Sequence, residues 1–141
     1  CAKYYGAKIA KNSNGGVIIN IASDLGLIAP DQRLYREDNV PDELQNVKPV
    51  TYSVVKSGLI GLTRYLATYW PEKNVRCNAL CPGGIENGQP EEFLNQVSKR
   101  IPMKRLAQSK EYQGTLIWML SESSSYLNGA IVPVDGGRTT W

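Results

Sequence analysis

The sequence predicts an α/β fold in which a parallel sheet carries helices on both faces. Three short apolar segments have the character of strands, at residues 17–23, 75–80 and 130–134. The chain between them carries helical patterns, and short turns close most strand ends. Strands that alternate with helices in this way favour parallel pairing through crossover connections. A hydrophobic content of 42% over 141 residues suits one soluble globular domain.

The first third of the chain is expected to hold a helix end, a strand and a long loop. Residues 1–14 are typical of the last turns of a helix that the Gly15-Gly16 pair stops. The segment "VIINIAS" at 17–23 is apolar and rich in β-branched residues, which indicates a buried parallel strand. Residues 24–51 are rich in Asp, Pro and Asn, so we predict a long loop with a turn of helix within 41–47.

Helical periodicity is strongest between Tyr52 and Trp70. Apolar side chains recur there every three or four residues, and Pro71 ends the pattern. These positions are Val55, Leu59, Leu62, Leu66 and Tyr69. The stripe predicts a helix whose apolar face packs in the core or against another subunit. Two further helices are predicted at 90–101, where Pro90 precedes two glutamates, and at 110–122.

Composition excludes several classes of partner. Sixteen basic and thirteen acidic side chains give a formal net charge of +3, and the basic residues are scattered along the chain. This scatter argues against a nucleic-acid partner. No apolar run approaches the ~18 residues that a membrane-spanning helix needs, so no membrane partner is expected.

The histidine and cysteine content bears on chemistry and compartment. The chain contains no histidine, which removes Ser-His-Asp triads and the commonest zinc ligand, so no metal site is expected. The three cysteines are odd in number. Cys77 and Cys81 stand too far apart along one strand to be bridged. We therefore expect a reducing, cytoplasmic location.

Polar and Gly-rich features follow the predicted strands, where parallel sheets bind ligands. Ser23 ends the first strand, "PGGIEN" follows the second, and Tyr52 begins a helix. Tyr52 and Lys56 are four residues apart, so they share one helix face within about 6 Å of each other. The ammonium group and the helix N-terminus both favour the phenolate form of Tyr52. With Ser23 bonded to the reacting oxygen, Tyr52 can exchange a proton with an alcohol or carbonyl while a separate cofactor carries hydride.

Each of these features also has an ordinary structural interpretation. A Tyr and a Lys four apart on a helix are common by chance, Ser23 alone is typical of a turn cap, and "PGG" alone is typical of a turn. The charged residues of the long loop are by default a solvated face. It is the combination of these features, in this order along the chain, that favours catalysis.

Four segments resemble the C-terminal half of a short-chain dehydrogenase/reductase. They are "GGVIINIAS" at 15–23, "YSVVKSGLIGLTRYLA" at 52–67, "VRCNALCPGGI" at 75–85 and "LNGAIVPVDGG" at 127–137. The resemblance implies that residues 1–141 are the catalytic half of a Rossmann-like doubly wound domain, without the N-terminal dinucleotide-binding half. The long loop, "PGGIENGQPEEFL" and the ending also resemble the dehydrogenases linked to bacterial flagellin glycosylation and acidic-sugar synthesis.

The resemblance also implies roles for single residues. Tyr52 would be the general acid/base, Ser23 would orient the substrate oxygen, and Lys56 would bind the nicotinamide ribose and promote ionisation of Tyr52. The residues that would border the nicotinamide are Pro82, Gly83 and Ile85. Asn87 stands where the family often has a Thr that holds the carboxamide. Gly84 would lie beside the substrate. The implied cofactor is NAD or NADP. No Gly-rich phosphate-binding turn occurs in the 141 residues, so the choice between the two stays open.

The long loop suggests a substrate class. Ser23 and Tyr52 are 29 residues apart, more than is usual in the family, so we expect an extended loop beside the substrate mouth. We hypothesise that Arg33 or Arg36 in this loop binds an anionic substrate, such as a phosphorylated or acidic sugar.

Two other functions stay open at this point. Nucleotide-sugar epimerases and dehydratases also use a Tyr-x-x-x-Lys pair. A sheet without its nucleotide-binding half exposes an unpaired strand edge, so the chain alone is compatible with a non-catalytic interaction module and is expected to be inactive. The helix that carries Tyr52 often packs at a subunit interface in this family, which predicts a homo-oligomer for the full-length protein.

Overall fold

The computed structural model describes all residues, 1–141, and contains a three-stranded parallel sheet in the order β1-β2-β3. The strands are β1 (Gly16–Ile21), β2 (Val75–Pro82) and β3 (Ile131–Val134). Gly16 pairs with Val75 at one end of the sheet, and Pro82 pairs with Val134 at the other. The predicted parallel sheet is confirmed.

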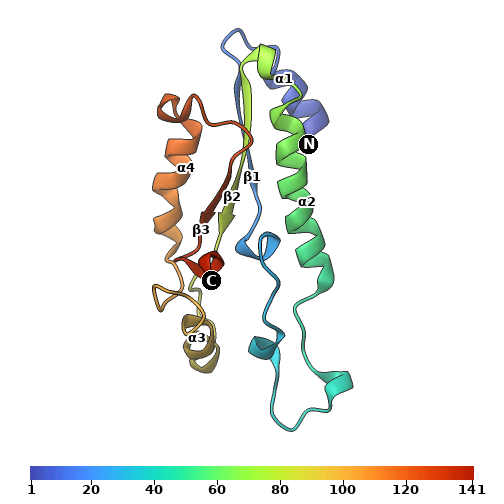
Figure 1. Cartoon of the computed structure of the whole chain (residues 1–141), viewed down its shortest axis with the longest axis vertical. Coiled ribbons are helices and arrows are strands. Elements are labelled where there is room, and N and C mark those ends of the chain that lie inside the picture. The colour runs from blue at the N-terminus through green and yellow to red at the C-terminus, as the bar shows by residue number, and fades with distance from the viewer.

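Helices cover both faces of the sheet (Figure 1). α2 (Val50–Ala67) lies along one face together with α1 (Ala7–Ile9), and α4 (Gln113–Leu120) lies along the other. The short helix α3 (Glu91–Ser98) lies beyond the carboxyl ends of the strands. The α/β layer architecture is therefore as predicted, and each predicted helix appears with its ends shifted by a few residues.

Burial differs between the strands because only β2 has a neighbour on both sides. Nearly all of β2 is buried, whereas β1 and β3 are only half-buried. The prediction of a fully buried strand at 17–23 was thus wrong in degree, since β1 forms one edge of this sheet. Ala22 and Ser23 follow β1 and are buried, although they lie just past its last paired residue.

The buried face of α2 is rotated from the predicted stripe. Its fully buried side chains are Ile60, Thr63, Leu66 and Ala67. Of the predicted stripe, Leu66 is buried and Leu59 and Leu62 pack against the core, but Val55 and Tyr69 are exposed. The helix packs on the sheet through two small clusters that contain Ala79, Cys81 and Cys77 of β2. The exposed side of α2 includes the large apolar side chains Val54, Val55 and Tyr65.

The long loop between β1 and α2 extends beyond the carboxyl end of the sheet (Figure 1). It contains three short 3-10 turns, at Asp24–Gly26, Gln32–Tyr35 and Asp42–Leu44. The last of these is the turn of helix predicted within 41–47. The Gln32 side chain ties the two arms of the loop together, because it accepts from the backbone N–H of Lys48 and donates to its carbonyl.

None of the helices combines the length and apolar character needed to cross a bilayer.

Candidate active site

The carboxyl ends of the strands meet at a cleft of about 360 Å³. Seven predicted site residues line it: Ser23, Tyr52, Lys56, Pro82, Gly83, Gly84 and Ile85. They come from the end of β1, the first turns of α2 and the turn after β2. Parallel pairing explains the convergence, since it brings consecutive strand ends to the same edge of the sheet.

Ser23 and Tyr52 face each other across this cleft. The Tyr52 hydroxyl donates to Ser23 Oγ over 3.5 Å, a long hydrogen bond. Ser23 is buried, and its Oγ also accepts from the backbone N–H of Leu25 at 3.2 Å. The turn-cap interpretation of Ser23 is therefore correct, and it holds together with the placement opposite Tyr52. Capping fixes the serine rotamer that points toward the phenol.

Two lysine ammonium groups lie near the Tyr52 ring. Lys56 Nζ is 5.6 Å from the ring centroid and donates to the carbonyl of Ile21 at 3.0 Å. Lys48, which the sequence did not single out, is closer, with its Nζ 4.1 Å from the centroid. A cation within about 6 Å of an aromatic face is attracted to it. The phenol therefore lies in a strongly positive environment.

The turn after β2 requires glycine for packing. A Cβ at Gly83 would stand 2.9 Å from Asp135 Cα, and one at Gly84 would stand 2.8 Å from a methyl group of Leu106. Both distances are too short for carbon atoms. The turn is further held by a parallel bridge between Ile85 and Ala107 and by the Tyr112 hydroxyl, which donates to the carbonyl of Gly83 at 3.0 Å. This packing gives the cleft a rigid wall.

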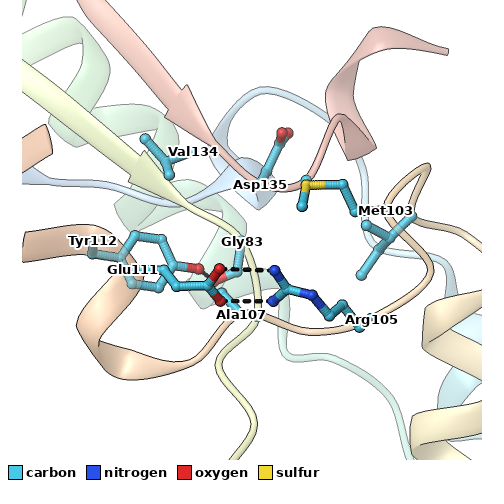
Figure 2. Close-up of a pocket in the computed structure, with 11 residues that line it drawn as sticks. Gly83, Met103, Arg105, Ala107, Glu111, Tyr112, Val134 and Asp135 are labelled. Carbon is cyan, nitrogen blue, oxygen red and sulfur yellow. Dashed lines mark hydrogen bonds and ion pairs between the residues drawn. The ribbon is translucent and has the colours of Figure 1, made fainter. Parts of the chain in front are cut away.

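The far side of the same turn borders a second, smaller pocket of about 170 Å³ (Figure 2). Arg105 and Glu111 form a bidentate ion pair at this pocket, and Tyr112 lies beside Gly83. Burial raises the pKa of Tyr112 to about 12, so its hydroxyl stays protonated and keeps donating to Gly83. Of the polar groups at this pocket, Tyr112 supports the turn through its bond to Gly83.

Three predicted site residues lie away from the cleft. Arg33 is paired with Asp31, and Arg36 is paired with Asp42. Both arginines line an adjoining groove on the outer side of the loop. Tyr35 and Phe93 line both hollows, and their rings stand 6.3 Å apart. Asn87 is exposed, and its backbone N–H donates to the side chain of Gln89 at 2.7 Å.

Several cleft residues were not recognised in the sequence. They are Asp24, Tyr35, Lys48 and Arg138, with apolar side chains such as Leu34, Phe93 and Leu106. Asp24 and Lys48 are neighbours of predicted residues, at i+1 from Ser23 and i−4 from Tyr52, so their positions gave a signal. Arg138 gave none, because its 114-residue separation from Asp24 is closed only by the fold. Burial raises the pKa of Tyr35, which keeps this phenol neutral.

The charged groups that line the cleft are Lys48, Lys56, Arg138 and Asp24. Three cations against one carboxylate give the cleft a net positive charge. No group of three or more His, Cys, Asp or Glu side chains is placed to share a metal ion.

Comparison with known proteins identifies the family. The family model described as "Enoyl-(Acyl carrier protein) reductase" matches residues 43–139. A solved structure of a short-chain dehydrogenase from Leptospira borgpetersenii with bound NAD+ superimposes with a TM-score of 0.86 and is 28% identical; the match covers 98% of this chain and 50% of that one. The chain belongs to the short-chain dehydrogenase/reductase family.

Two curated relatives extend this finding. An NADP-dependent mannitol dehydrogenase of Hypocrea jecorina is 34% identical, with 99% of this chain and 48% of the relative covered. Post-translational flagellin modification protein A of Campylobacter coli is 32% identical, with 92% and 48% covered. This relative bears out the predicted resemblance to flagellin-modification proteins. The chain spans about half the length of these short-chain dehydrogenase/reductase relatives.

Proposed function

We propose that these residues form the catalytic half of an NAD(P)-dependent oxidoreductase that transfers hydride between a nicotinamide cofactor and an alcohol or carbonyl group. The observation that carries the proposal is the meeting of Tyr52, Ser23 and Lys56 in one cleft. Tyr52 is the general acid/base in this proposal. Its hydroxyl already lies within long hydrogen-bond reach of Ser23, which orients the substrate oxygen.

The cleft suits a nicotinamide cofactor in shape and charge. Lys56 and Tyr52 offer polar groups for the ribose hydroxyls, and the rigid wall of Pro82, Gly83 and Ile85 offers a surface for the nicotinamide ring. Asn87 follows this wall, and we assign it to the carboxamide side. When bound, the cofactor supplies hydride chemistry that no side chain of this chain provides. The Leptospira dehydrogenase was solved with bound NAD+ and the Hypocrea mannitol dehydrogenase is NADP-dependent, which supports both as candidates.

We further propose that the catalytic half works with a nucleotide-binding half and within a homo-oligomer. Coverage of about half of each relative supports the first point. The exposed apolar side of α2 supports the second. It carries Val54, Val55 and Tyr65, each more than half exposed. Large apolar side chains exposed together on one helix are typical of a surface that is covered in an assembly.

For the substrate we propose a sugar derivative or sugar alcohol, because one relative is named for mannitol and another for flagellin modification. An anionic sugar agrees with the positive cleft. Arg33 and Arg36 contribute to this only from the outer groove, where each already has a carboxylate partner.

The test uses the longest natural polypeptide that contains these residues. Purified protein is supplied with NAD+ or NADP+ and a panel of sugar alcohols that includes mannitol, or with NADH or NADPH and the matching ketoses and keto-sugar acids, and the absorbance of the reduced cofactor is followed. Tyr52→Phe is expected to lower kcat by about 10²- to 10⁴-fold while NADH binding, measured by fluorescence, persists. Full activity in Tyr52→Phe would remove the tyrosine from the mechanism.

A further inference from the structure

A hydrogen-bonded chain of four side chains runs from the cleft to the turn at Arg138–Thr140. The Tyr52 hydroxyl donates to Ser23 Oγ at 3.5 Å. The Ser23 hydroxyl donates in turn to Asp24 Oδ1 at 2.9 Å. On the other carboxylate oxygen, Arg138 Nη1 donates to Asp24 Oδ2 at 2.9 Å. Asp24 is thus the acceptor on which donors from both directions converge.

Burial makes this arrangement rigid. Asp24 is only 2% exposed, and the side chain of Arg138 is 11% exposed. A buried carboxylate is costly unless charge and hydrogen bonds compensate it, and Asp24 has both, since the Leu25 N–H also donates to Oδ1 at 2.7 Å. Every oxygen of Asp24 is therefore held. The carboxylate beside Ser23 has one position.

The bond to Asp24 decides which hydrogen bonds the Ser23 hydroxyl can still make in the cleft. A serine hydroxyl has one proton and two lone pairs. Asp24 takes the proton, and the Leu25 N–H points at the oxygen from the turn. The remaining lone pair faces Tyr52. In this state Ser23 accepts hydrogen bonds in the cleft and has none to donate.

Capping of the turn at Asp24–Gly26 accounts for only part of this geometry. The Leu25 N–H is shared between Asp24 Oδ1 at 2.7 Å and Ser23 Oγ at 3.2 Å, so the cap uses only one oxygen of the carboxylate. A cap does not require a buried guanidinium from the other end of the chain. Arg138 and Asp24 also both line the cleft with Tyr52. The pair is placed where it acts on the serine that faces the phenol.

We propose that Asp24 is a positioning residue for Ser23, that Arg138 fixes Asp24, and that together they hold the Ser23 oxygen as an acceptor for the hydroxyl of an alcohol substrate. This inference rests on the proposed oxidoreductase function. An alcohol has one hydroxyl proton, and in the bound complex it donates this proton to the Ser23 lone pair in place of the Tyr52 hydroxyl, whereas the ketone formed from it has none. The pair therefore strengthens binding of the alcohol more than binding of the ketone. During oxidation this same proton turns away from Ser23 and passes from the alcohol oxygen to Tyr52, which acts as the general base, while Asp24 and Arg138 exchange no proton.

The experiment removes the ion pair with and without the serine hydroxyl, in the longest natural polypeptide. Asp24→Ala with Arg138→Met removes both charges at once, so that neither is left buried alone. This variant, Ser23→Ala and the combined triple variant are compared with the unmodified protein. The Michaelis constants are measured for an alcohol that the unmodified protein oxidises and for its ketone. NADH binding by fluorescence shows that each variant is folded.

We expect the paired variant to raise KM for the alcohol about three- to tenfold, the size of one hydrogen bond, and to change KM for the ketone less than twofold. In the Ser23→Ala background the same change should have no further effect on the alcohol, because Asp24 acts through Ser23. Arg138→Lys keeps the charge and should restore most of the alcohol affinity that Arg138→Met loses. If the paired variant loses NADH binding, Asp24→Leu with Arg138→Met replaces it with the same expected pattern, because the larger side chain fills the space of the carboxylate and again leaves no buried charge.

Three results overturn the inference. The first is an equal effect on alcohol and ketone, and the second is an undiminished effect in the Ser23→Ala background; both indicate a structural role only. If either occurs while Tyr52→Phe abolishes turnover, the proposed function stands and this inference fails. The third is an unmodified protein that binds neither NADH nor NADPH and turns over no member of the panel. That result overturns the function and the inference together.

Discussion

Gly26 lies where the turn at Asp24–Gly26 contacts α2. Its replacement by a larger residue should lower catalysis, although Gly26 has no side chain that could act on the substrate. A Cβ at Gly26 would stand 2.9 Å from both the carbonyl carbon and the oxygen of Lys56, and 3.1 Å from Ile60 Cδ1. Ordinary contacts of a Cβ begin near 3.4 Å. Because the nearest atoms belong to the α2 backbone, the turn and the helix must separate by about 0.5 Å, and Tyr52 moves relative to Ser23.

The expected size follows from the sensitivity of catalysis to placement. A misplacement of about 1 Å costs on the order of 100-fold, so a shift of half that size is expected to lower kcat about tenfold in Gly26→Ala. Overpacking should also lower the free energy of unfolding by about 1–3 kcal/mol. The measurements are steady-state kinetics and urea unfolding of the longest natural polypeptide.

Gly114 in α4 provides the matched control. A Cβ there meets nothing within 4 Å, and the residue is exposed. Gly114→Ala should leave kcat unchanged and should stabilise the helix by roughly 0.5–1 kcal/mol. Unchanged kcat in Gly26→Ala, or an equal loss in both variants, would refute the reasoning from contact between the turn and α2.

Three further predictions test other parts of the structure. Arg33 and Arg100 hold the pKa of Asp31 well below its usual range, so these ion pairs stabilise the fold fully above the unfolded pKa of about 4, and the stabilisation is lost as pH falls toward the folded pKa. Between pH 7 and 3, Tm should therefore fall less steeply with pH in Asp31→Asn than in the unmodified protein. Buried Asn78 donates to the Leu127 carbonyl and accepts from the Ala130 N–H. Asn78→Leu should therefore lower the free energy of unfolding, measured by urea titration, by about 2–4 kcal/mol, whereas Asn95→Leu at an exposed position should change it by less than about 0.5 kcal/mol. Lys48→Met should lower kcat about two- to fivefold through loss of the ammonium over Tyr52, and an equal loss in Lys110→Met would contradict this.

Local patterns predicted the elements better than their burial. The β-branched run at 17–23 and the helical stripe from Tyr52 to Trp70 identified β1 and α2, because both patterns follow from backbone geometry. The exposed edge of β1 and the rotation of the α2 core face toward Ile60 and Thr63 could not be read from sequence. Both depend on which surfaces the rest of the fold covers.

In the site, too, local patterns predicted some residues, and others depended on the whole fold. Ser23, Tyr52 and Lys56 could be brought together by reasoning from strand ends and from the helical repeat, and the structure places all three at one cleft. Arg33 and Arg36 were assigned from loop length and charge alone. Their carboxylate partners Asp31 and Asp42 lie close in sequence, but charge patterning does not reveal which pairs form. Arg138 required the tertiary structure, because only the fold shows that it reaches Asp24.

The ion pair between Asp24 and Arg138 makes two positions that are 114 residues apart in sequence depend on each other. A substitution at either position to a neutral residue leaves the other charge buried alone, whereas a paired change to two neutral residues removes that penalty. Relatives should therefore vary at these two positions jointly, and an engineer who grafts a new C-terminal turn onto this domain must redesign the residue after the serine in the same step.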